Sequence, residues 1–268
     1  MRICILTDEV PEDFDPAPFM EGFDWEMVTM TDPVIEVLRT LDERQEFDVY
    51  LNICEGYEPG EDWEYQGIDV VNALEELNLP YTGAQPAFFD PTREQMQSAA
   101  DEHGVNFAKG YRVTSVEEAQ RLVGNLRYPI MVKHPKSYGS TGMFRESRVD
   151  TPEQLVKQVD RVCSEFGAAR MEEFIVGKEY NVLVVDNPDD LDNPIAYPPA
   201  ELIFPPGEEF WHTDIKWDYN VPFDFNQVTD PGLVGRLHDT AIRMHKAIDG
   251  VAYGRCDIRM NERGALFV

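Results

Sequence analysis

Short apolar runs alternate with segments of helical spacing in the first third of the chain. Residues 2–7 (RICILT) and 47–53 (FDVYLNI) have the apolar character of parallel strands. Between them, residues 32–41 repeat their apolar positions at helical intervals, and Pro33 suits a first helical turn. A second helix is predicted over 66–77, followed by a short strand and turn at 80–83. This alternation predicts a small open α/β sheet. The first strand is not followed by a GxGxxG motif, which argues against a dinucleotide site there.

A boundary near residues 86–91 separates this sheet from a segment of α+β character, and a third segment begins near residue 169. The second segment is predicted to hold helices at 92–103, 115–126 and 152–166, and strands at 107–113, 129–133 and 145–149. The third is predicted to hold strands at 170–175, 179–185, 199–204, 254–260 and 265–268, and a helix at 232–248.

Composition limits the partners and the compartment. The 268 residues are 43% apolar, which suits a packed core, and no apolar run approaches the ~20 residues of a membrane span. Residues 1–10 do not have the pattern of a secretory signal. The 51 acidic and 23 basic residues give a formal net charge of −28, which repels nucleic acid and anionic membranes. We therefore expect a cytoplasmic protein with neither partner, in which the few lysines are informative.

The segment YPIMVKHPKSYGSTGM (128–143) joins a buried strand to a small-residue loop. Its apolar run ends at Lys133, and Gly139, Ser140 and Thr141 follow. One interpretation is structural: an edge strand, a lysine whose stem lies along apolar surface, and a turn. The other is that the lysine and the loop's backbone N–H groups hold a phosphate, since glycine permits close approach. The P-loop pattern GxxxxGK[ST] is absent, so such a site needs another arrangement.

Three later features follow in chain order. The sequence MEEFIVGKEYNV (171–182) joins two strands, and such a hinge can bind a purine edge while Phe174 and Ile175 pack on its face. Lys216 follows an aromatic loop, and Asp257 lies within the strand GRCDIRM. Each feature alone fits an ordinary structural role. Their order and spacing together favour a nucleotide site.

Together these motifs resemble the ATP-grasp superfamily, and most of all the D-alanine–D-alanine ligases. The resemblance begins at residue 47 and rests on FDVYLNICEG, ALEELNLPYTGA, YPIMVKHPKSYGSTG, EEFIVGKEYNV and YGRCDIRM. It implies a small open parallel α/β domain followed by a two-lobed ATP-grasp fold. Residues 1–88 would form the N-terminal domain, residues 89–168 the first lobe and residues 169–268 the second.

The resemblance also implies roles for individual residues. The phosphates of ATP would be bound by cationic side chains and the small-residue loop: Arg93, Lys133, Lys216, Gly139, Ser140 and Thr141. The adenosine would be bound by residues of the hinge and the strand after it: Glu172, Glu173, Phe174, Ile175 and Glu179. Asp257 would hold Mg²⁺, and Arg255 would act with Lys216 as a catalytic residue at the reacting carboxylate.

The implied activity is an ATP-dependent ligation of a carboxylate to an amine. ATP phosphorylates the carboxylate to an acyl phosphate, which the amine then attacks; lysines, loop amides and magnesium stabilise the charge that develops. The expected cofactors are ATP and Mg²⁺, the expected substrates are amino acid-like, and a homodimer is among the assemblies we consider. The alternatives are a non-catalytic nucleotide-binding protein and an acidic scaffold, which leaves the ordered lysines unexplained.

Two departures from the family pattern concern the substrate and the end of the chain. Glu55 stands where D-alanine ligases usually have histidine, and TDEVPEDFDPAPF does not match their substrate loop. We therefore expect a substrate other than D-alanine, with an extra amine or another cation. The sequence stops at Val268, before the Glu-x-Asn that completes the family's magnesium site. We expect a truncated second lobe that binds nucleotide and has little ligase activity.

Overall fold

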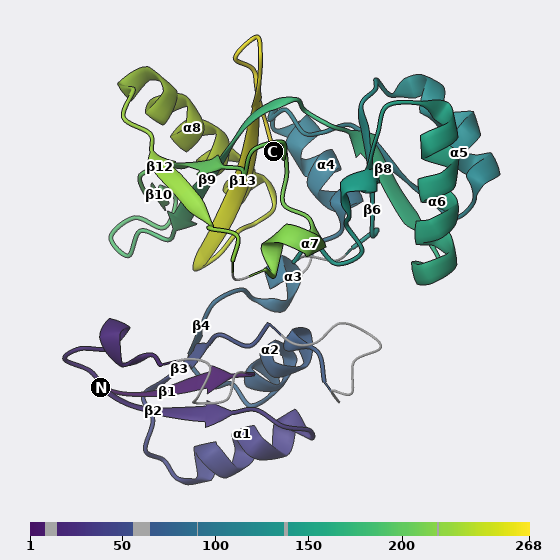
Figure 1. Ribbon diagram of the computed structural model, residues 1–268. Coiled ribbons are helices and arrows are strands. Elements are labelled where there is room, and N and C mark those ends of the chain that lie inside the picture. The colour runs from purple at the N-terminus through teal and green to yellow at the C-terminus, as the bar shows by residue number, and fades with distance from the viewer. Residues whose placement is uncertain (9–14, 56–64, 90, 137–138, 219) are drawn as a thin grey trace. The chain divides into compact units, whose positions relative to one another are not determined.

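The computed structural model describes residues 1–8, 15–55, 65–89, 91–136, 139–218 and 220–268. The chain divides into two compact units: unit 1 is Met1–Asp90 with Val251–Tyr253, and unit 2 is Pro91–Gly250 with Gly254–Val268 (Figure 1). The first predicted domain boundary lies close to the boundary between the units, and the three-domain division stays a proposal.

Unit 1 is built on a parallel four-stranded sheet, which confirms the predicted N-terminal α/β fold. The strand order is β2 (Asp24–Thr29), β1 (Arg2–Thr7), β3 (Val49–Asn52) and β4 (Tyr81–Thr82). The helices are η1 (Ala17–Phe19), α1 (Val34–Glu43), α2 (Gly67–Glu76) and α3 (Pro86–Phe89). The sequence pattern does not predict β2, because DWEMVT mixes acids with apolar residues, as an edge strand with partial exposure allows.

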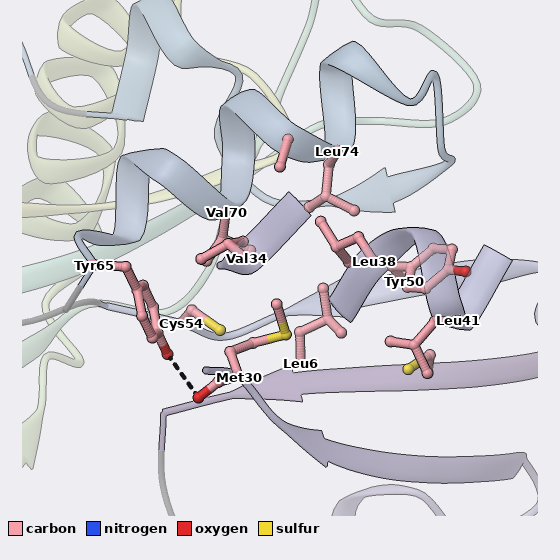
Figure 2. Close-up of a cluster of buried hydrophobic side chains, with 12 residues drawn as sticks. Leu6, Met30, Val34, Leu38, Leu41, Tyr50, Cys54, Tyr65, Val70 and Leu74 are labelled. Atoms are coloured by element: carbon pink, nitrogen blue, oxygen red, sulfur yellow. Dashed lines mark hydrogen bonds between the residues drawn. The ribbon is translucent and has the colours of Figure 1, made fainter. Parts of the chain in front are cut away.

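Alternate residues of β1 point to two separate apolar clusters, because successive side chains of a strand face opposite sides of the sheet. Cys4 and Leu6 pack with residues of α1 and α2, of which Leu38 and Leu74 are fully buried (Figure 2). Ile3 and Ile5 pack on the other side. The sheet of unit 1 is therefore apolar on both faces, as a parallel sheet requires.

Unit 2 begins with α4 (Arg93–Glu102) and contains two antiparallel sheets. The first sheet has the strand order β5 (Gly110–Val113), β8 (Ala169–Glu173), β6 (Ile130–Lys133) and β7 (Arg148–Val149). The helices α5 (Val116–Leu122) and α6 (Pro152–Phe166) pack on one of its faces, and η2 (Val123–Asn125) and η3 (Arg145–Ser147) are short 3-10 turns. The predicted lobe boundary at residue 169 falls just before β8, which pairs inside this first sheet.

The second sheet has the strand order β12 (Asp224–Gln227), β11 (Ala200–Ile203), β9 (Gly177–Val185), β13 (Tyr253–Asn261) and β14 (Leu266–Phe267), and β10 (Ile195–Ala196) also pairs with β9. Helix α8 (Pro231–Ala247) covers one face, where Tyr180, Val182 and Ile258 are buried against it (Figure 1). The short helix α7 (Thr213–Lys216) lies in the loop between β11 and β12. The other face of β9 and β13 carries the polar residues of the candidate site.

Local sequence signals explain most element boundaries in unit 2. Helix α6 has the predicted bounds because Thr151 accepts a hydrogen bond from the Gln154 backbone N–H and Gly167 ends the helix with φ = 76°. The predicted helix at 115–126 is shorter, since α5 ends at Leu122 and continues as η2. The short strands β10 and β12 have no counterpart in the sequence prediction. Among the described residues, no helix is long and apolar enough to cross a membrane.

Candidate functional site

The first sheet of unit 2 has one apolar face and one charged face. Ile130, Val132 and Met171 belong to the core under α5 and α6. The residues between them, including Lys133 on β6 and Glu172 on β8, point to the opposite face. The antiparallel register pairs Lys133 with Arg170 and Met131 with Glu172, so two cations and a carboxylate meet on that face.

Lys133 and Glu172 form a buried ion pair on this charged face. Their side chains are 15% and 11% exposed. Burial lowers the pKa of Lys133 to about 8, and the positive charges of Arg93 and Arg170 act in the same direction against the favourable effect of Glu172. For Glu172, burial alone would raise the pKa, but Lys133, Arg170 and Arg93 together outweigh it and lower the pKa to about 2. At neutral pH both partners are therefore charged.

Arg170 is the member of this cluster that the sequence analysis misses. Its side chain is completely buried and donates to Glu172, to Glu94 and to Gln97. Arg93 is the first residue of α4, and its charge acts on both Lys133 and Glu172. An arginine within the strand ARMEE, where an apolar residue would pack without cost, is the signal that could reveal it.

The small-residue loop continues from the end of β6 toward η3. Ser137 and Tyr138 lie outside the described residues. Gly139, Ser140 and Gly142 all have positive φ, at 69°, 67° and 65°. A Cβ on Gly142 would lie 2.7 Å from the ring of Phe166, so the loop packs closely on α6 only because this residue is glycine.

The loop is bound to the segment that carries Lys216. The Thr213 hydroxyl donates to the Ser140 carbonyl at 2.8 Å, the Thr213 N–H donates to the Met143 carbonyl at 2.9 Å, and the Ser140 hydroxyl donates to the Trp211 carbonyl at 3.2 Å. Lys216 ends α7, and its Nζ lies 5.6 Å from the centre of the Trp217 ring. The structure thus brings together two segments that the sequence separates by some seventy residues, and both were predicted to bind phosphate.

The hinge between β8 and β9 is held in place by contacts with side chains and backbone groups from other parts of unit 2. The Glu173 carboxylate accepts from the Arg127 N–H at 3.0 Å. Phe174 is buried, its ring meets Phe210 edge-on at 5.7 Å, and the guanidinium of Arg259 lies 4.4 Å from its centre. Ile175 offers its carbonyl to Arg259 at 2.7 Å. The predicted contacts of these residues with a purine stay predictions, and the ring of Phe174 is already packed against side chains of the chain itself.

Glu179 lies at the start of β9 and is paired with Arg259 at 2.8 Å. Burial raises its pKa, and the negative charge of Asp257 acts in the same direction, whereas Arg259 opposes both. Arg259 also donates to the carbonyls of Gly177 at 2.9 Å and Glu209 at 3.0 Å. Arg259, which the sequence pattern does not reveal, fixes the orientation of Glu179 and connects the hinge to the loop after β11.

Asp257 and Arg255 project side by side from β13. The Asp257 carboxylate accepts from Arg255 Nε at 2.9 Å and from the Asn181 amide at 2.7 Å. In the described part of the chain, no group of three His, Cys, Asp or Glu side chains is arranged to hold a metal ion. Magnesium is commonly held by one or two carboxylates together with phosphates and water. The Asp257 carboxylate could therefore serve as the single protein ligand of such an ion.

A profile of the family described as "D-ala D-ala ligase C-terminus" matches residues 103–268. The chain belongs to the D-alanine–D-alanine ligase family of the ATP-grasp superfamily. This finding confirms the resemblance seen in the sequence. The matched region includes Lys133, Arg170 and Glu172, the small-residue loop and the polar face of β9 and β13, whereas Arg93, Glu94 and Gln97 of α4 precede it.

Individual D-alanine–D-alanine ligases and related ligases are distant in sequence. A D-alanine–D-alanine ligase of Halothermothrix orenii is 27% identical over 223 residues, which are 78% of this chain and 60% of that protein. The fold resembles the Bacillus anthracis D-alanine–D-alanine ligase complexed with ATP, with a TM-score of 0.68, 18% identity and coverage of 100% and 84% of the two chains. It also resembles the L-amino acid ligase of Bacillus licheniformis, with a TM-score of 0.71, 15% identity and coverage of 100% and 65%. These similarities confirm the ATP-grasp fold.

Proposed function

We propose that this member of the family binds ATP in unit 2 and uses it to join a carboxylate to an amine. The observation that supports this most directly is the junction of the small-residue loop with the Lys216 segment through Thr213 and Ser140. Lys133 lies at the end of the strand that leads into the same loop. In a chain with a net charge of −28, a polyanion needs such a local group of cations and backbone donors.

In the proposed reaction a substrate carboxylate oxygen attacks the γ-phosphorus of ATP, the bond to the bridging oxygen breaks, and ADP leaves. The amine nitrogen then attacks the acyl carbon, the bond to the phosphate oxygen breaks, and inorganic phosphate and a proton are released. Lys133 and Lys216 orient the phosphates and offset their charge, and Arg255 holds the carboxylate. Magnesium bound with Asp257 would neutralise further phosphate charge.

The remaining parts of the proposal rest on the family and on the sequence. Glu172, Glu173, Phe174 and Ile175 would line the adenine site and Glu179 would bind the ribose, and the substrates would be small amino acid-like molecules. Glu55, whose backbone N–H donates to Asp8 at 2.6 Å, favours a substrate with an additional cation. Residues 9–14, part of the unmatched sequence TDEVPEDFDPAPF, lie outside the described residues. A cytoplasmic location and a homodimer complete the proposal.

Phosphate release in the presence of ATP, magnesium and amino acids tests this function. D- and L-amino acids are supplied singly and in pairs, including lysine and ornithine for the cation expected opposite Glu55. We expect phosphate release that requires both a carboxylate and an amine, with a product of the summed mass minus water. D-alanyl-D-alanine as the preferred product would contradict the predicted substrate class. Failure of the chain to bind ATP in calorimetry would contradict the function itself.

A nucleotide-binding protein without ligase activity is the second candidate. One observation favours it: the Asp257 carboxylate is already engaged by Arg255 and Asn181, which leaves it fewer free lone pairs for a metal ion. This candidate predicts ATP binding of ordinary affinity without phosphate release for any pair of substrates. The same assay, together with calorimetry, distinguishes the two candidates.

A further inference from the structure

The completely buried Arg170 is the feature of unit 2 that the proposed reaction does not use. A buried guanidinium is costly unless all its hydrogen bonds are satisfied, and an apolar residue of similar size is often at least as stabilising. Arg170 lies on β8, directly opposite Lys133 of β6. Its retention at this place therefore calls for a role in the arrangement of the charged groups around it.

The three nitrogens of Arg170 reach two different elements. Nε donates to Glu172 at 2.8 Å on its own strand, Nη1 donates to Glu94 at 2.9 Å, and Nη2 donates to Gln97 at 2.9 Å. Glu94 and Gln97 are one turn apart on α4, so they present their side chains on the same side of that helix. The planar guanidinium thus connects α4 to the sheet with fixed geometry.

The contact with Glu172 fixes the partner of Lys133. Arg170 takes Oε2 of Glu172, and Lys133 takes Oε1. With one oxygen held by Arg170, the carboxylate cannot rotate freely, and the ammonium of Lys133 keeps its place at the end of β6. Gly110 of β5 makes room for this arrangement, because a Cβ there would lie 2.6 Å from Cβ of Glu172 and 2.9 Å from Nη2 of Arg170.

We propose that Arg170 is a positioning residue of the nucleotide site: it docks α4, and with it Arg93, against the Lys133–Glu172 pair, so that both cations face the phosphates of ATP. This inference rests on the proposed nucleotide binding and adds a residue to it. Arg170 itself does not touch the nucleotide. It acts through the Glu172 carboxylate on one side and through Glu94 and Gln97 on the other.

The charges of the cluster give the inference a signature that a purely structural arginine would lack. Lys133 is faced by Glu172 and Arg170 from β8 and by Arg93 from α4. Burial is the main cause of its lowered pKa, and Arg93 and, to a smaller degree, Arg170 act in the same direction. ATP binding above pH 8 must therefore draw a proton onto Lys133. Removal of the charge of Arg170 would let Lys133 keep its proton to higher pH.

Two substitutions separate the geometry of Arg170 from its charge. Arg170→Lys keeps a cation but cannot reach Glu172, Glu94 and Gln97 together, whereas Arg170→Met removes the charge as well. We measure the affinity for ATP by calorimetry from pH 7 to 9.5, with folding checked by circular dichroism. Arg121→Met, at an exposed arginine of α5, serves as the matched control. Gln97→Leu breaks one link to α4 and leaves the Glu172 contact intact, and it remains informative if the Arg170 variants fail to fold.

We expect both Arg170 variants to bind ATP about tenfold more weakly at pH 7.5, which corresponds to ~1.4 kcal/mol. The pH at which affinity declines should move upward in Arg170→Met and stay in place in Arg170→Lys. Gln97→Leu should weaken binding less, and Arg121→Met should have no effect. Folded Arg170 variants with wild-type affinity and an unchanged pH profile would overturn the inference while nucleotide binding stands. Absence of ATP binding by the wild-type chain would overturn both.

Discussion

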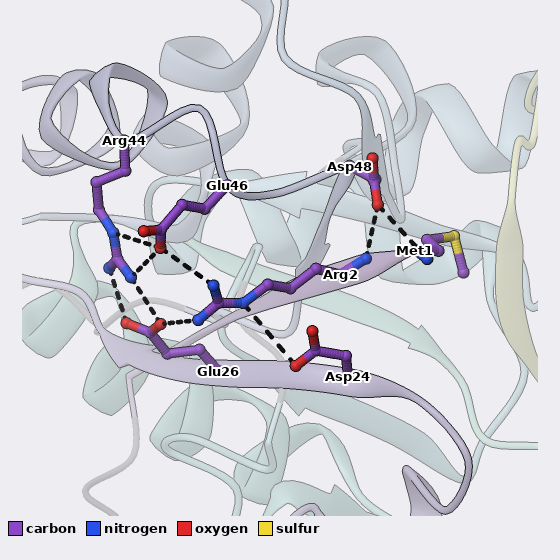
Figure 3. A network of polar contacts seen from close by, with 7 residues as sticks. All are labelled: Met1, Arg2, Asp24, Glu26, Arg44, Glu46 and Asp48. Atoms are coloured by element: carbon purple, nitrogen blue, oxygen red, sulfur yellow. Dashed lines mark hydrogen bonds and ion pairs between the residues drawn. The ribbon is translucent and has the colours of Figure 1, made fainter.

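Each of the two units contains a network of arginines and glutamates, and the two networks differ in their exposure to solvent. In unit 1, Arg2 and Arg44 bind Glu26 and Glu46 at the edge of the sheet (Figure 3). Arg44 and Glu26 are 34% and 33% exposed. In unit 2, Arg170 and Lys133 bind Glu172 on a face that solvent barely reaches. The same types of ion pair therefore occur in two different dielectric environments.

The exposed network braces the edge of the sheet, and the hydrogen bond from Arg44 lowers the pKa of Glu26; in the buried network, desolvation is the largest influence on the pKa of each partner. Arg2 and Arg44 also lie 5.2 Å and 5.0 Å from the centre of the Phe47 ring, so they fasten the turn before β3 as well as the edge strand β2. Water and salt screen such pairs, which contribute little to stability. In the buried network, desolvation makes each charge depend on its partners and lowers the pKa of Lys133 to about 8.

Removal of the central carboxylate should produce the largest contrast between the networks. Glu172→Ala leaves Arg170 and Lys133 buried without their shared partner, and we expect a loss of about 3–5 kcal/mol in the free energy of unfolding of unit 2. The measurement is urea unfolding followed by circular dichroism, with hydrogen exchange of β8 to assign the effect to unit 2.

Glu26→Ala in the exposed network is the matched control for this experiment, since Glu26 also holds two arginines. We expect a much smaller loss in the free energy of unfolding, with faster hydrogen exchange in β2 and β1 only. Equal losses in the two variants would show that burial does not separate the two networks.

The second-largest expected effect is on ATP affinity, which should depend on Lys133 of the buried network. Lys133→Ala removes a charge-assisted contact with a phosphate, and the expected loss is ~1.5–3 kcal/mol of binding free energy, or about one to two decades in affinity. Calorimetry with ATP measures it, and Lys216→Ala should behave similarly. Lys157→Ala, at an exposed position of α6, is the control lysine. Wild-type affinity in both Lys133→Ala and Lys216→Ala would remove these lysines from the site.

The buried pair should also give unit 2 a distinct pH dependence. The pKa of Glu172 is lowered to about 2 from its ordinary value of 4.5, so its stabilising contribution is complete above pH 4.5 and is lost as pH falls toward 2. The pKa of Lys133 is lowered from 10.5 to about 8, so as pH rises the folded state releases the Lys133 proton before the unfolded state does. The contribution of Lys133 to stability therefore becomes more favourable between pH 8 and 10.5.

The difference between the wild type and Lys133→Met, followed by thermal unfolding from pH 7 to 10, isolates the contribution of Lys133. ATP affinity should change in the opposite direction over the same range, because Lys133 loses its charge. A constant stability difference from pH 7 to 10 would contradict the lowered pKa of Lys133.

The fold of this chain was largely predictable because its signals are local. Thr151 and Gly167 mark the ends of α6, and apolar runs such as RICILT mark buried strands. The pattern fails where a strand is short or lies at an edge, as in β2, β10 and β12. There the backbone pairs with a neighbour that lies far away in the sequence or across a turn. The side chains are partly exposed in β2 and fully exposed in β12, and they carry little periodicity.

The candidate site shows the same division. Lys133, Lys216 and Asp257 could be proposed because the order and spacing of their motifs along the chain resemble those of the ATP-grasp family. The partners that fix their surroundings could not, since Arg170 meets Glu94 across 76 positions and Arg259 meets Glu179 across 80. The contact of Phe174 with a purine stays a prediction, and its packing against Phe210 and Arg259 involves distant segments that the local pattern does not reveal.

The smallest expected effect is a difference between the two networks in how salt changes the melting temperature of their variants. Glu26→Gln keeps the shape of the side chain and removes its charge, and the exposed pairs with Arg2 and Arg44 are screened in water. We expect the melting temperature to fall by less than about 2 °C at low ionic strength and not at all in 1 M NaCl, where the Debye length is ~3 Å. Glu172→Gln should lower the melting temperature by a similar amount in both salts, because dissolved ions do not reach the face that it shares with Arg170. A Glu172→Gln effect that disappears in 1 M NaCl would mean that solvent reaches the Lys133 cluster, and the contrast between the two networks would then be one of degree.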